Sequence, residues 1–466
     1  MAKLKDKVFR IAFGDILGRG FGVITTIYLA RVLGAESFGL ITVALSFLGY
    51  SIWFADLGLL NIGAREMAKK EESRAFRAGE IFLFKIVLGL VVLSFLQWIV
   101  PQLPIESLQK RIILGFSYAL IPYSFLMEWY YNGKQFFGKV ALSKIVNGFV
   151  YLALVIFLVK SEADLESVPI LYTSGLSASA FILLLFSIKE NPFKQGLRSF
   201  GIFKELFNSA FILGLGSFFS QVLQLLPPLA IGLFLSVRDA GIYGAAIRII
   251  FIVMLLDKIF VNLLLPNLSS KWELNKTLAT ENLNKVYRIL PFIGGVCSLS
   301  IAVASPDIIS LVYGNEYAES SGVLAVLTIL LFFTFQNSLF TFGLIAIGKD
   351  KEFLYSTVVS GSLTILMILL SASFGSLITV AIVISASEIL ITLISFTWFS
   401  RFVDIKSIAP TIITLFVGLA LFYASTVLLL PSYLEAILVL FIFVPMLFIL
   451  KVCSVDDLKW LKEKLG

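Results

Sequence analysis

The chain has 466 residues, of which 59% are hydrophobic and only 14% are charged. Soluble proteins carry about 25% charged residues, so this composition excludes an ordinary soluble domain and indicates a protein that crosses a membrane many times. The net charge is +7 and histidine is absent, which excludes histidine bases and histidine metal ligands. The two cysteines, Cys297 and Cys453, have no metal-binding spacing, and we expect no metal site and inert thiols.

Apolar runs predict fourteen transmembrane helices. The first run is too long for a signal-peptide core and lacks a small-residue cleavage site, so we expect it to remain as a helix. The predicted spans are 8–33, 39–64, 81–103, 111–132, 139–159, 168–188, 206–234, 241–266, 288–312, 322–347, 353–372, 376–400, 408–430 and 433–451.

The distribution of Lys and Arg predicts the topology. With a cytoplasmic N-terminus, 29 of the 37 basic residues fall in cytoplasmic segments, including all those in 65–85, and 5 fall in external segments. This asymmetry satisfies the positive-inside rule and puts both termini in the cytoplasm, so the basic surplus implies no nucleic-acid partner. The longest external loop lies around 161–168, which is too short for a catalytic loop and disfavours a membrane glycan polymerase or glycosyltransferase.

A short turn occurs twice in the chain. "RVLGAESFGL" (31–40) has a looser copy, "LSVRDAGIYG" (235–244), and an offset of 202 superimposes Gly39 on Gly241. We expect Gly34 to end the first helix in a left-handed conformation and Ser37 to cap the next helix. Six spans separate the copies, so the two halves would share one orientation about an axis along the membrane normal.

The repeat predicts an all-α polytopic fold with two parallel six-helix bundles in pseudo-twofold relation. The bundles would occupy 1–200 and 201–402, and an accessory helix pair with a cytoplasmic tail would occupy 403–466. Such bundles can give alternating access to a central cavity.

Polar stripes in three hydrophobic spans predict helices that face this cavity, because polar side chains are costly against lipid. Arg248 adds the eighth span, and Asp15 could instead neutralise Arg19 as an i, i+4 pair. The stripes are Asp15, Arg19, Gly22 and Thr26 in the first span, Thr42, Ser46, Gly49, Trp53 and Asp56 in the second, and Ser217, Gln221 and Gln224 before the kink-prone Pro227-Pro228 in the seventh.

Other charged residues also fall within the predicted spans. Asp257 lies about 180° around its helix from Arg248, so the two cannot face one cavity. Lys258 lies near the cytoplasmic end, where its side chain can snorkel to the interface. Glu128 precedes "WYYNGK", which we interpret as an interfacial aromatic belt. Glu388 remains a candidate cavity acid.

Two further patterns in the sequence do not indicate a binding site. "GLIAIGKD" (343–350) departs from the phosphate-loop pattern at its last position and lies at the end of a hydrophobic helix, so we expect no ATP site. Asp456 and Asp457 lie in a charged amphipathic tail, and we expect both on a solvated face.

The segment "ARVLGAESFGLITVALSFLGYSIWFADLGLLNIGAREMAKK" (30–70) resembles the opening of the polysaccharide-repeat, Wzx-type flippases of the multidrug/oligosaccharidyl-lipid/polysaccharide exporter superfamily. The resemblance implies a transporter rather than an enzyme. Its substrate would be an undecaprenyl-pyrophosphate-linked oligosaccharide, such as an O-antigen repeat unit, carried across the cytoplasmic (inner) membrane without ATP. Membrane lipids, a glycan polymerase and chain-length machinery are the expected partners.

The resemblance also implies a cationic cavity, with Arg19 and Arg248 as candidates for the diphosphate. Arginine binds phosphate in bidentate fashion, which agrees with this role. Arg31 at the external mouth and Lys258 are further cationic candidates, and Ser217, Gln221 and Gln224 are polar ones.

No cofactor is expected beyond a coupling cation or the membrane potential. An inside-negative potential favours outward movement of an anion by about 2.3 kcal/mol per charge per 100 mV. Resetting the empty carrier would use H⁺ or Na⁺ at Asp56 or Glu388, with Asp15 and Asp257 as further candidate acids.

Other functions stay open. A lipid II flippase would share the fold and the cationic cavity. A cation-coupled multidrug exporter would favour an acidic cavity, and a non-transporting scaffold would leave the charged stripes unexplained.

Overall fold

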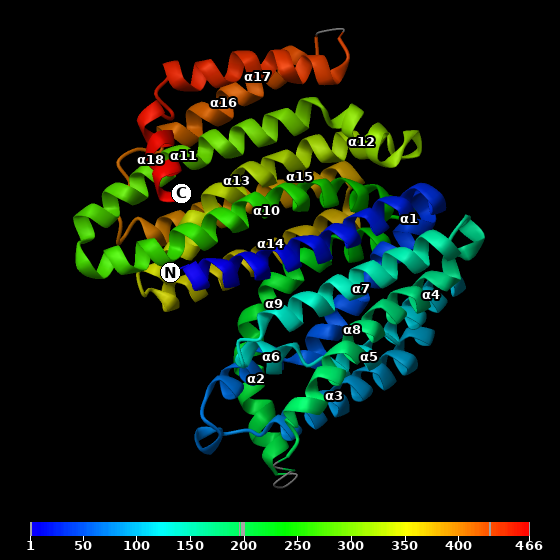
Figure 1. Cartoon of the computed structure of the whole chain (residues 1–466). Helices are drawn as coiled ribbons and strands as arrows, with labels where there is room; N and C mark the ends of the chain where they lie inside the picture. The colour runs from blue at the N-terminus through cyan, green and yellow to red at the C-terminus, as the bar shows by residue number, and fades with distance from the viewer. Residues whose placement is uncertain (1, 195, 197–200, 428–429, 466) are drawn as a thin grey trace. The chain divides into compact units, whose positions relative to one another are not determined.

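A computed structural model describes residues 2–194, 196, 201–427 and 430–465 of the chain (Figure 1). The elements among these residues are helices, and no strand occurs among them. The prediction of an all-α fold is therefore confirmed. The chain forms two compact units, unit 1 (Met1–Gly241) and unit 2 (Ile242–Gly466), and each is described by itself.

Unit 1 contains nine α-helices and three 3₁₀ turns among its described residues. The elements are α1 (Ala2–Asp56), α2 (Leu59–Ala68), η1 (Glu71–Ser73), α3 (Ala78–Ile99), η2 (Val100–Gln102), α4 (Ser107–Ser117), α5 (Leu120–Phe125), α6 (Glu128–Gly133), α7 (Phe137–Leu158), η3 (Glu162–Ser167), α8 (Val168–Glu190) and α9 (Ile202–Phe234). The helix α10 (Val237–Leu274) begins at the end of unit 1 and continues in unit 2.

The remaining elements belong to unit 2. They are α11 (Lys276–Val303), α12 (Ser305–Tyr313), η4 (Asn315–Tyr317), α13 (Ser320–Ala346), α14 (Asp350–Phe374), α15 (Leu377–Phe399), α16 (Ala409–Ser425), α17 (Ser432–Ile449) and α18 (Val455–Leu465).

Eleven helices within the described residues are long and apolar enough to cross a membrane. The first of these segments, Gly20–Asp56, combines the first two predicted spans, and Gln224–Phe234 and Ala409–Ser425 are shorter apolar helices in the seventh and thirteenth predicted spans. The chain is therefore a multi-pass membrane protein, and the count of fourteen spans stays a prediction. The boundary between the two compact units falls at 241/242, within α10. The predicted division at 200/201 and 402/403 also stays a prediction.

The hinge inside α1 lies at Gly34, whose backbone has φ 75° and ψ 173°. Only glycine adopts such a positive φ without strain, which explains why the two predicted helices join at this residue. Ser37 has a different role from the predicted one, because its hydroxyl donates a 2.7 Å hydrogen bond to Glu162 Oε1. This contact ties the hinge to the 3₁₀ turn η3.

The two copies of the repeated turn contact each other within unit 1. A Cβ on Gly39 would lie 1.9 Å from the carbonyl oxygen of Val237, and a Cβ on Gly241 would lie 2.0 Å from that of Ala35. The offset of 202 that relates Gly39 to Gly241 also relates Ala35 to Val237. The contact is therefore reciprocal, as a pseudo-twofold arrangement of the two turns requires.

In unit 2, α16 and α17 pack against α11 and form a pair at one side of the unit (Figure 1). Leu299 of α11 and Phe443 of α17 are buried in their common apolar cluster. A Cβ on Gly295 would lie 2.3 Å from the Thr414 side chain, so α11 and α16 approach closely at this glycine.

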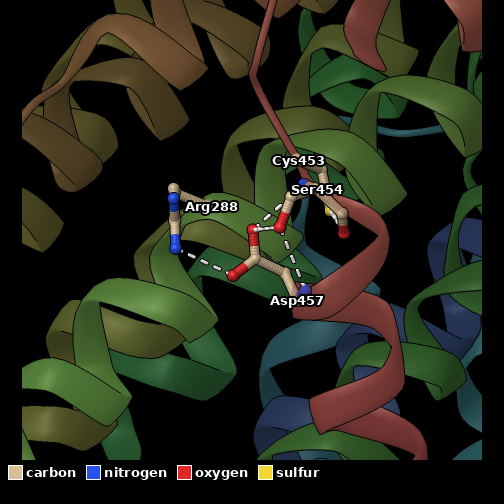
Figure 2. A network of polar contacts seen from close by, with 4 residues as sticks. All are labelled: Arg288, Cys453, Ser454 and Asp457. Carbon is tan, nitrogen blue, oxygen red and sulfur yellow. Dashed lines mark hydrogen bonds and ion pairs between the residues drawn. The ribbon is translucent and has the colours of Figure 1, made fainter.

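The C-terminal helix α18 is attached to α11 by one acidic residue. Figure 2 shows Asp457 between Arg288 and Ser454: its Oδ1 accepts a 2.8 Å hydrogen bond from Arg288, and its Oδ2 accepts one of 2.8 Å from the Ser454 hydroxyl. The Asp457 side chain is 3% exposed, whereas Asp456 is almost fully exposed. The prediction of a solvated face is wrong for Asp457, because this residue both caps α18 and pairs with Arg288.

Candidate functional site

The polar stripe of the second predicted span is covered by α9 within unit 1. A Cβ on Gly49 would lie 2.6 Å from the Leu225 side chain, and the rings of Trp53 and Phe218 lie 4.7 Å apart. The Tyr50 hydroxyl donates to the carbonyl oxygen of Val222. Thr42 and Ser46 are buried and bond to carbonyl oxygens of their own helix. The small and polar residues of this stripe thus permit close packing of α1 and α9.

Two of the predicted polar residues of α9 lie on its surface. Gln221 and Gln224 are both exposed, and α9 continues through Pro227 and Pro228 to Phe234. The side chain of Ser217 lies outside the described part of the chain. The two glutamine side chains therefore lie on the surface of α9.

Of two predicted cationic residues of unit 1, the structure describes the side chain of one and not that of the other. Arg31 is exposed near the hinge of α1. Arg19 and its neighbour Asp15 lie in α1, but their side chains are outside the described residues.

Asp56 ends α1 and connects three helices of unit 1. Its Oδ2 accepts a 3.2 Å hydrogen bond from the backbone N–H of Leu60 in α2, and its Oδ1 accepts one of 3.2 Å from the Tyr123 hydroxyl in α5. Leu57 and Gly58, which follow it, have φ values of 44° and 93°. The carboxylate thus stabilises the start of α2 just beyond a sharp turn of the backbone.

Lys85 is a charged residue of this region that the sequence prediction missed. It was counted with the basic residues of 65–85, although it also falls in the predicted span 81–103; in the structure it lies within α3 and is only 2% exposed. Its Nζ donates a 3.2 Å hydrogen bond to the carbonyl oxygen of Leu126 and lies 4.3 Å from the centre of the Tyr123 ring. Asp56 and Glu128 are near enough to interact with it electrostatically. The apolar residues on both sides of Lys85 in the sequence are the pattern that could have indicated its burial.

The segment after Glu128 is not an interfacial aromatic belt. Trp129, Tyr130 and Tyr131 are buried in the short helix α6, which packs against α2. A Cβ on Gly63 would lie 2.7 Å from the Trp129 ring. The interpretation was wrong because aromatic residues near the end of a span also serve as core residues when a small residue on the next helix accommodates them.

Arg248 is half-buried in the part of α10 that belongs to unit 2. Its Nη1 donates a 2.9 Å hydrogen bond to the carbonyl oxygen of Gly244. Its charge also acts on Tyr313 and Tyr317, beyond the end of α11: burial raises the pKa of both phenols, and the guanidinium partly offsets this effect. Arg248 therefore lies beside two buried hydroxyl-bearing rings.

Two acids of unit 2 are held by α13. Asp257 in α10 is 6% exposed, and its Oδ2 accepts a 2.5 Å hydrogen bond from the Ser338 hydroxyl. Its Oδ1 is buried and has no hydrogen-bond partner among the described residues. Glu388 in α15 accepts a 3.2 Å hydrogen bond from the Asn337 amide. The acids thus bond to adjacent residues of one helix, while Lys258 is exposed.

The comparisons with known proteins agree with this architecture. An Escherichia coli K12 protein named as an O-antigen transporter is 22% identical over 79% of this chain and 90% of its own length. A Haloferax volcanii protein named as a low-salt glycan biosynthesis flippase is 23% identical over 87% of this chain and 85% of its own length.

Two solved structures share the fold. The lipid II flippase MurJ in an inward closed conformation superimposes with a TM-score of 0.72 and 15% identity over 94% of this chain and 98% of its own. An inward-facing multidrug resistance MATE family transporter of the MOP superfamily superimposes with a TM-score of 0.69 and 12% identity over 85% of this chain and 97% of its own.

The relatives are transporters rather than catalytic enzymes, and the resemblance of the segment 30–70 falls within a longer family match. The polysaccharide biosynthesis protein family matches residues 4–272, which is more than half of the sequence, and the chain therefore belongs to that family.

Proposed function

We propose that the protein is a flippase for a lipid-linked oligosaccharide, whose carrier is undecaprenyl pyrophosphate. The family match over residues 4–272 carries this proposal, and the two relatives named as an O-antigen transporter and a glycan flippase support it. The protein would work in the cytoplasmic membrane by alternating access and without ATP, with both termini in the cytoplasm. A glycan polymerase and chain-length machinery would receive the product.

Arg248 and Arg19 are the residues proposed to bind the diphosphate. A charge within a span usually faces a cavity or a partner, and Arg248 is a half-buried guanidinium within such a span. Arginine presents a planar set of donors that matches phosphate oxygens. Gln221 and Gln224, exposed on α9, would hydrogen-bond the sugars.

The cation that resets the carrier is proposed to bind at Asp257 and Glu388. Asp257 is buried and one of its carboxylate oxygens has no described partner. A buried carboxylate of this kind is stabilised by a proton or a bound cation. Asn337, Ser338 and the neighbouring Thr341 supply further oxygen atoms along α13.

The test is transport of a fluorescent undecaprenyl-pyrophosphate-linked oligosaccharide in proteoliposomes, measured as protection from an impermeant quencher. Arg19→Ala and Arg248→Ala should each lower the rate at least tenfold at normal protein levels. Arg111→Ala is the matched control, because Arg111 is exposed and pairs with Glu166 on the surface. Full activity of both cavity variants would overturn the diphosphate assignment.

The same vesicles separate the competing functions. Equal transport of lipid II would shift the assignment to the peptidoglycan precursor. Export of cationic dyes in the absence of glycan transport would instead indicate a multidrug exporter.

A further inference from the structure

The fourth predicted span, in unit 1, is broken into three short helices, which leaves some backbone groups without a partner in their own helix. It consists of α4, α5 and α6, and the chain leaves helical geometry at Leu126 and Met127 between α5 and α6. Carbonyl oxygens at such a break have lost their partners within the helix, and the hydrocarbon region offers them no water. The Leu126 carbonyl oxygen is satisfied by Lys85 Nζ at 3.2 Å.

The groups around this ammonium are those that bind a small cation. Besides the Leu126 carbonyl, they are the face of the Tyr123 ring at 4.3 Å and the carboxylates of Asp56 and Glu128. They come from four elements: the end of α1, the helix α5, the break itself and the helix α6. Carbonyl oxygens at broken membrane helices and aromatic faces both coordinate monovalent cations in transporters and channels.

Lys85 does not reach water by extending along the helix, because its side chain is almost completely buried. A buried ammonium is costly unless the surrounding groups compensate its charge. The Tyr123 hydroxyl donates to Asp56 Oδ1 at 3.2 Å, so the ring beneath the ammonium also orients one of the two acids. The Leu126 carbonyl and the Tyr123 ring therefore contact the ammonium, Asp56 bonds to Tyr123, and Glu128 adds a second negative charge nearby.

We propose that Lys85 is a tethered cation that permanently occupies a monovalent-cation site at the break of the fourth span. The ammonium positions Asp56, Tyr123 and the Leu126 carbonyl, and unit 1 needs no free cation to do so. The Lys85 ammonium is a charge of the protein itself, and its site is separate from the proposed diphosphate site.

Removing the side chain tests whether a cation site remains. Lys85→Ala leaves space for a small alkylammonium ion, so ethylammonium at tens of millimolar should restore what the truncation removes. Lys85→Met fills the same space without a charge and should not respond. Lys110→Ala is the matched control, because Lys110 also donates to a carbonyl oxygen, that of Pro101, but at an exposed position.

The first readout is the Tm of the purified full-length protein. We expect Lys85→Ala to have a lower Tm that rises by several degrees with ethylammonium, while the wild type, Lys85→Met and Lys110→Ala do not change. A folded Lys85→Ala protein whose Tm does not respond would overturn the proposal. If Lys85→Ala is recovered only when ethylammonium is present during extraction, the site is supported equally.

The second readout is glycan-lipid transport. Lys85→Met should lose at least tenfold in rate at normal yield, and Lys85→Ala should regain activity with ethylammonium. If Lys85→Ala is never recovered, full activity of Lys85→Met would overturn the proposal and its loss at normal yield would support it. A Tm response without glycan transport, even in the wild type, would contradict the proposed function and leave the cation site supported.

Discussion

Gly39 and Gly241 contact each other's helices through their backbones. A Cβ on Gly39 would lie 1.9 Å from the Val237 carbonyl oxygen, and one on Gly241 would lie 2.0 Å from the Ala35 carbonyl oxygen. Each glycine also approaches the backbone nitrogen of the other. Two turns about two hundred residues apart in the sequence thus each need a residue without a side chain at the contact.

Gly39→Ala and Gly241→Ala should each destabilise the protein by about 1–3 kcal/mol, because backbone atoms must move to admit the methyl group. Gly138→Ala is the control, since a Cβ at Gly138 would meet no atom within 4 Å. Thermal unfolding in detergent measures the effect. Equal Tm values for Gly39→Ala and Gly138→Ala would contradict the close contact.

Asp257→Asn and Glu388→Gln should each lower the stimulation of transport by an imposed Na⁺ or proton gradient at least fivefold. Each change removes the negative charge but keeps the shape of the side chain, so the contacts with Ser338 and Asn337 can persist. Glu281→Gln, at an exposed position of α11, is the control. Full gradient response in both acid variants would exclude them from coupling.

Cys453 should react slowly with maleimides. Burial, and then the charge of Asp457, raise the pKa of its thiol from 9.0 to about 11. Because the thiolate is the nucleophile, this change lowers the reactive fraction at pH 8 about 100-fold, and the labelling rate should rise steeply above that pH. Labelling in a Cys297→Ser background measures the thiol alone.

Releasing α18 should remove this protection. Arg288→Ala breaks the 2.8 Å contact with Asp457 and should accelerate labelling of Cys453 at least tenfold (Figure 2). Lys459→Ala, which affects an exposed pair with Asp456, should leave the rate unchanged. Similar rates in the two variants would show that the Arg288 contact does not hold the helix.

The predicted topology is tested by cysteines at two exposed loop positions. In a background without Cys297 and Cys453, Glu106→Cys should be labelled by an impermeant reagent in intact cells, and Lys406→Cys only after the membrane is opened. Both positions are exposed, so access depends on the side of the membrane. The reverse pattern would put the N-terminus outside.

The sequence predicts the helical architecture and the repeated turn well, because apolar runs and obligatory glycines are local properties. Gly34, Gly39 and Gly241 are examples, since each is required by backbone geometry that a short motif reveals. The residues at which a span begins and ends depend less on the local sequence. Lys85 lies inside the predicted span 81–103 but was counted with the basic segment before it, because a charge near the end of an apolar run is ordinarily expected at the interface.

Burial that depends on tertiary contacts could not be predicted. The aromatic residues of α6 are covered because Gly63 leaves room for Trp129, and Asp457 is covered because Arg288 lies opposite it. The sequence places these partners 66 and 169 positions apart. Periodicity describes one helix at a time and contains no information about such pairs.

The turn after Asp56 also connects α9 mechanically to the end of α1. A Cβ on Gly58 would lie 2.7 Å from the Ala210 carbonyl oxygen, and one on Gly214 would lie 2.5 Å from the Leu57 carbonyl oxygen, so the turn and α9 touch backbone to backbone. Rigid contacts of this kind transmit displacement rather than absorb it. A displacement of α9 would therefore move the Asp56 carboxylate. The length of the hydrogen bond between Asp56 and Tyr123 would then report the position of α9.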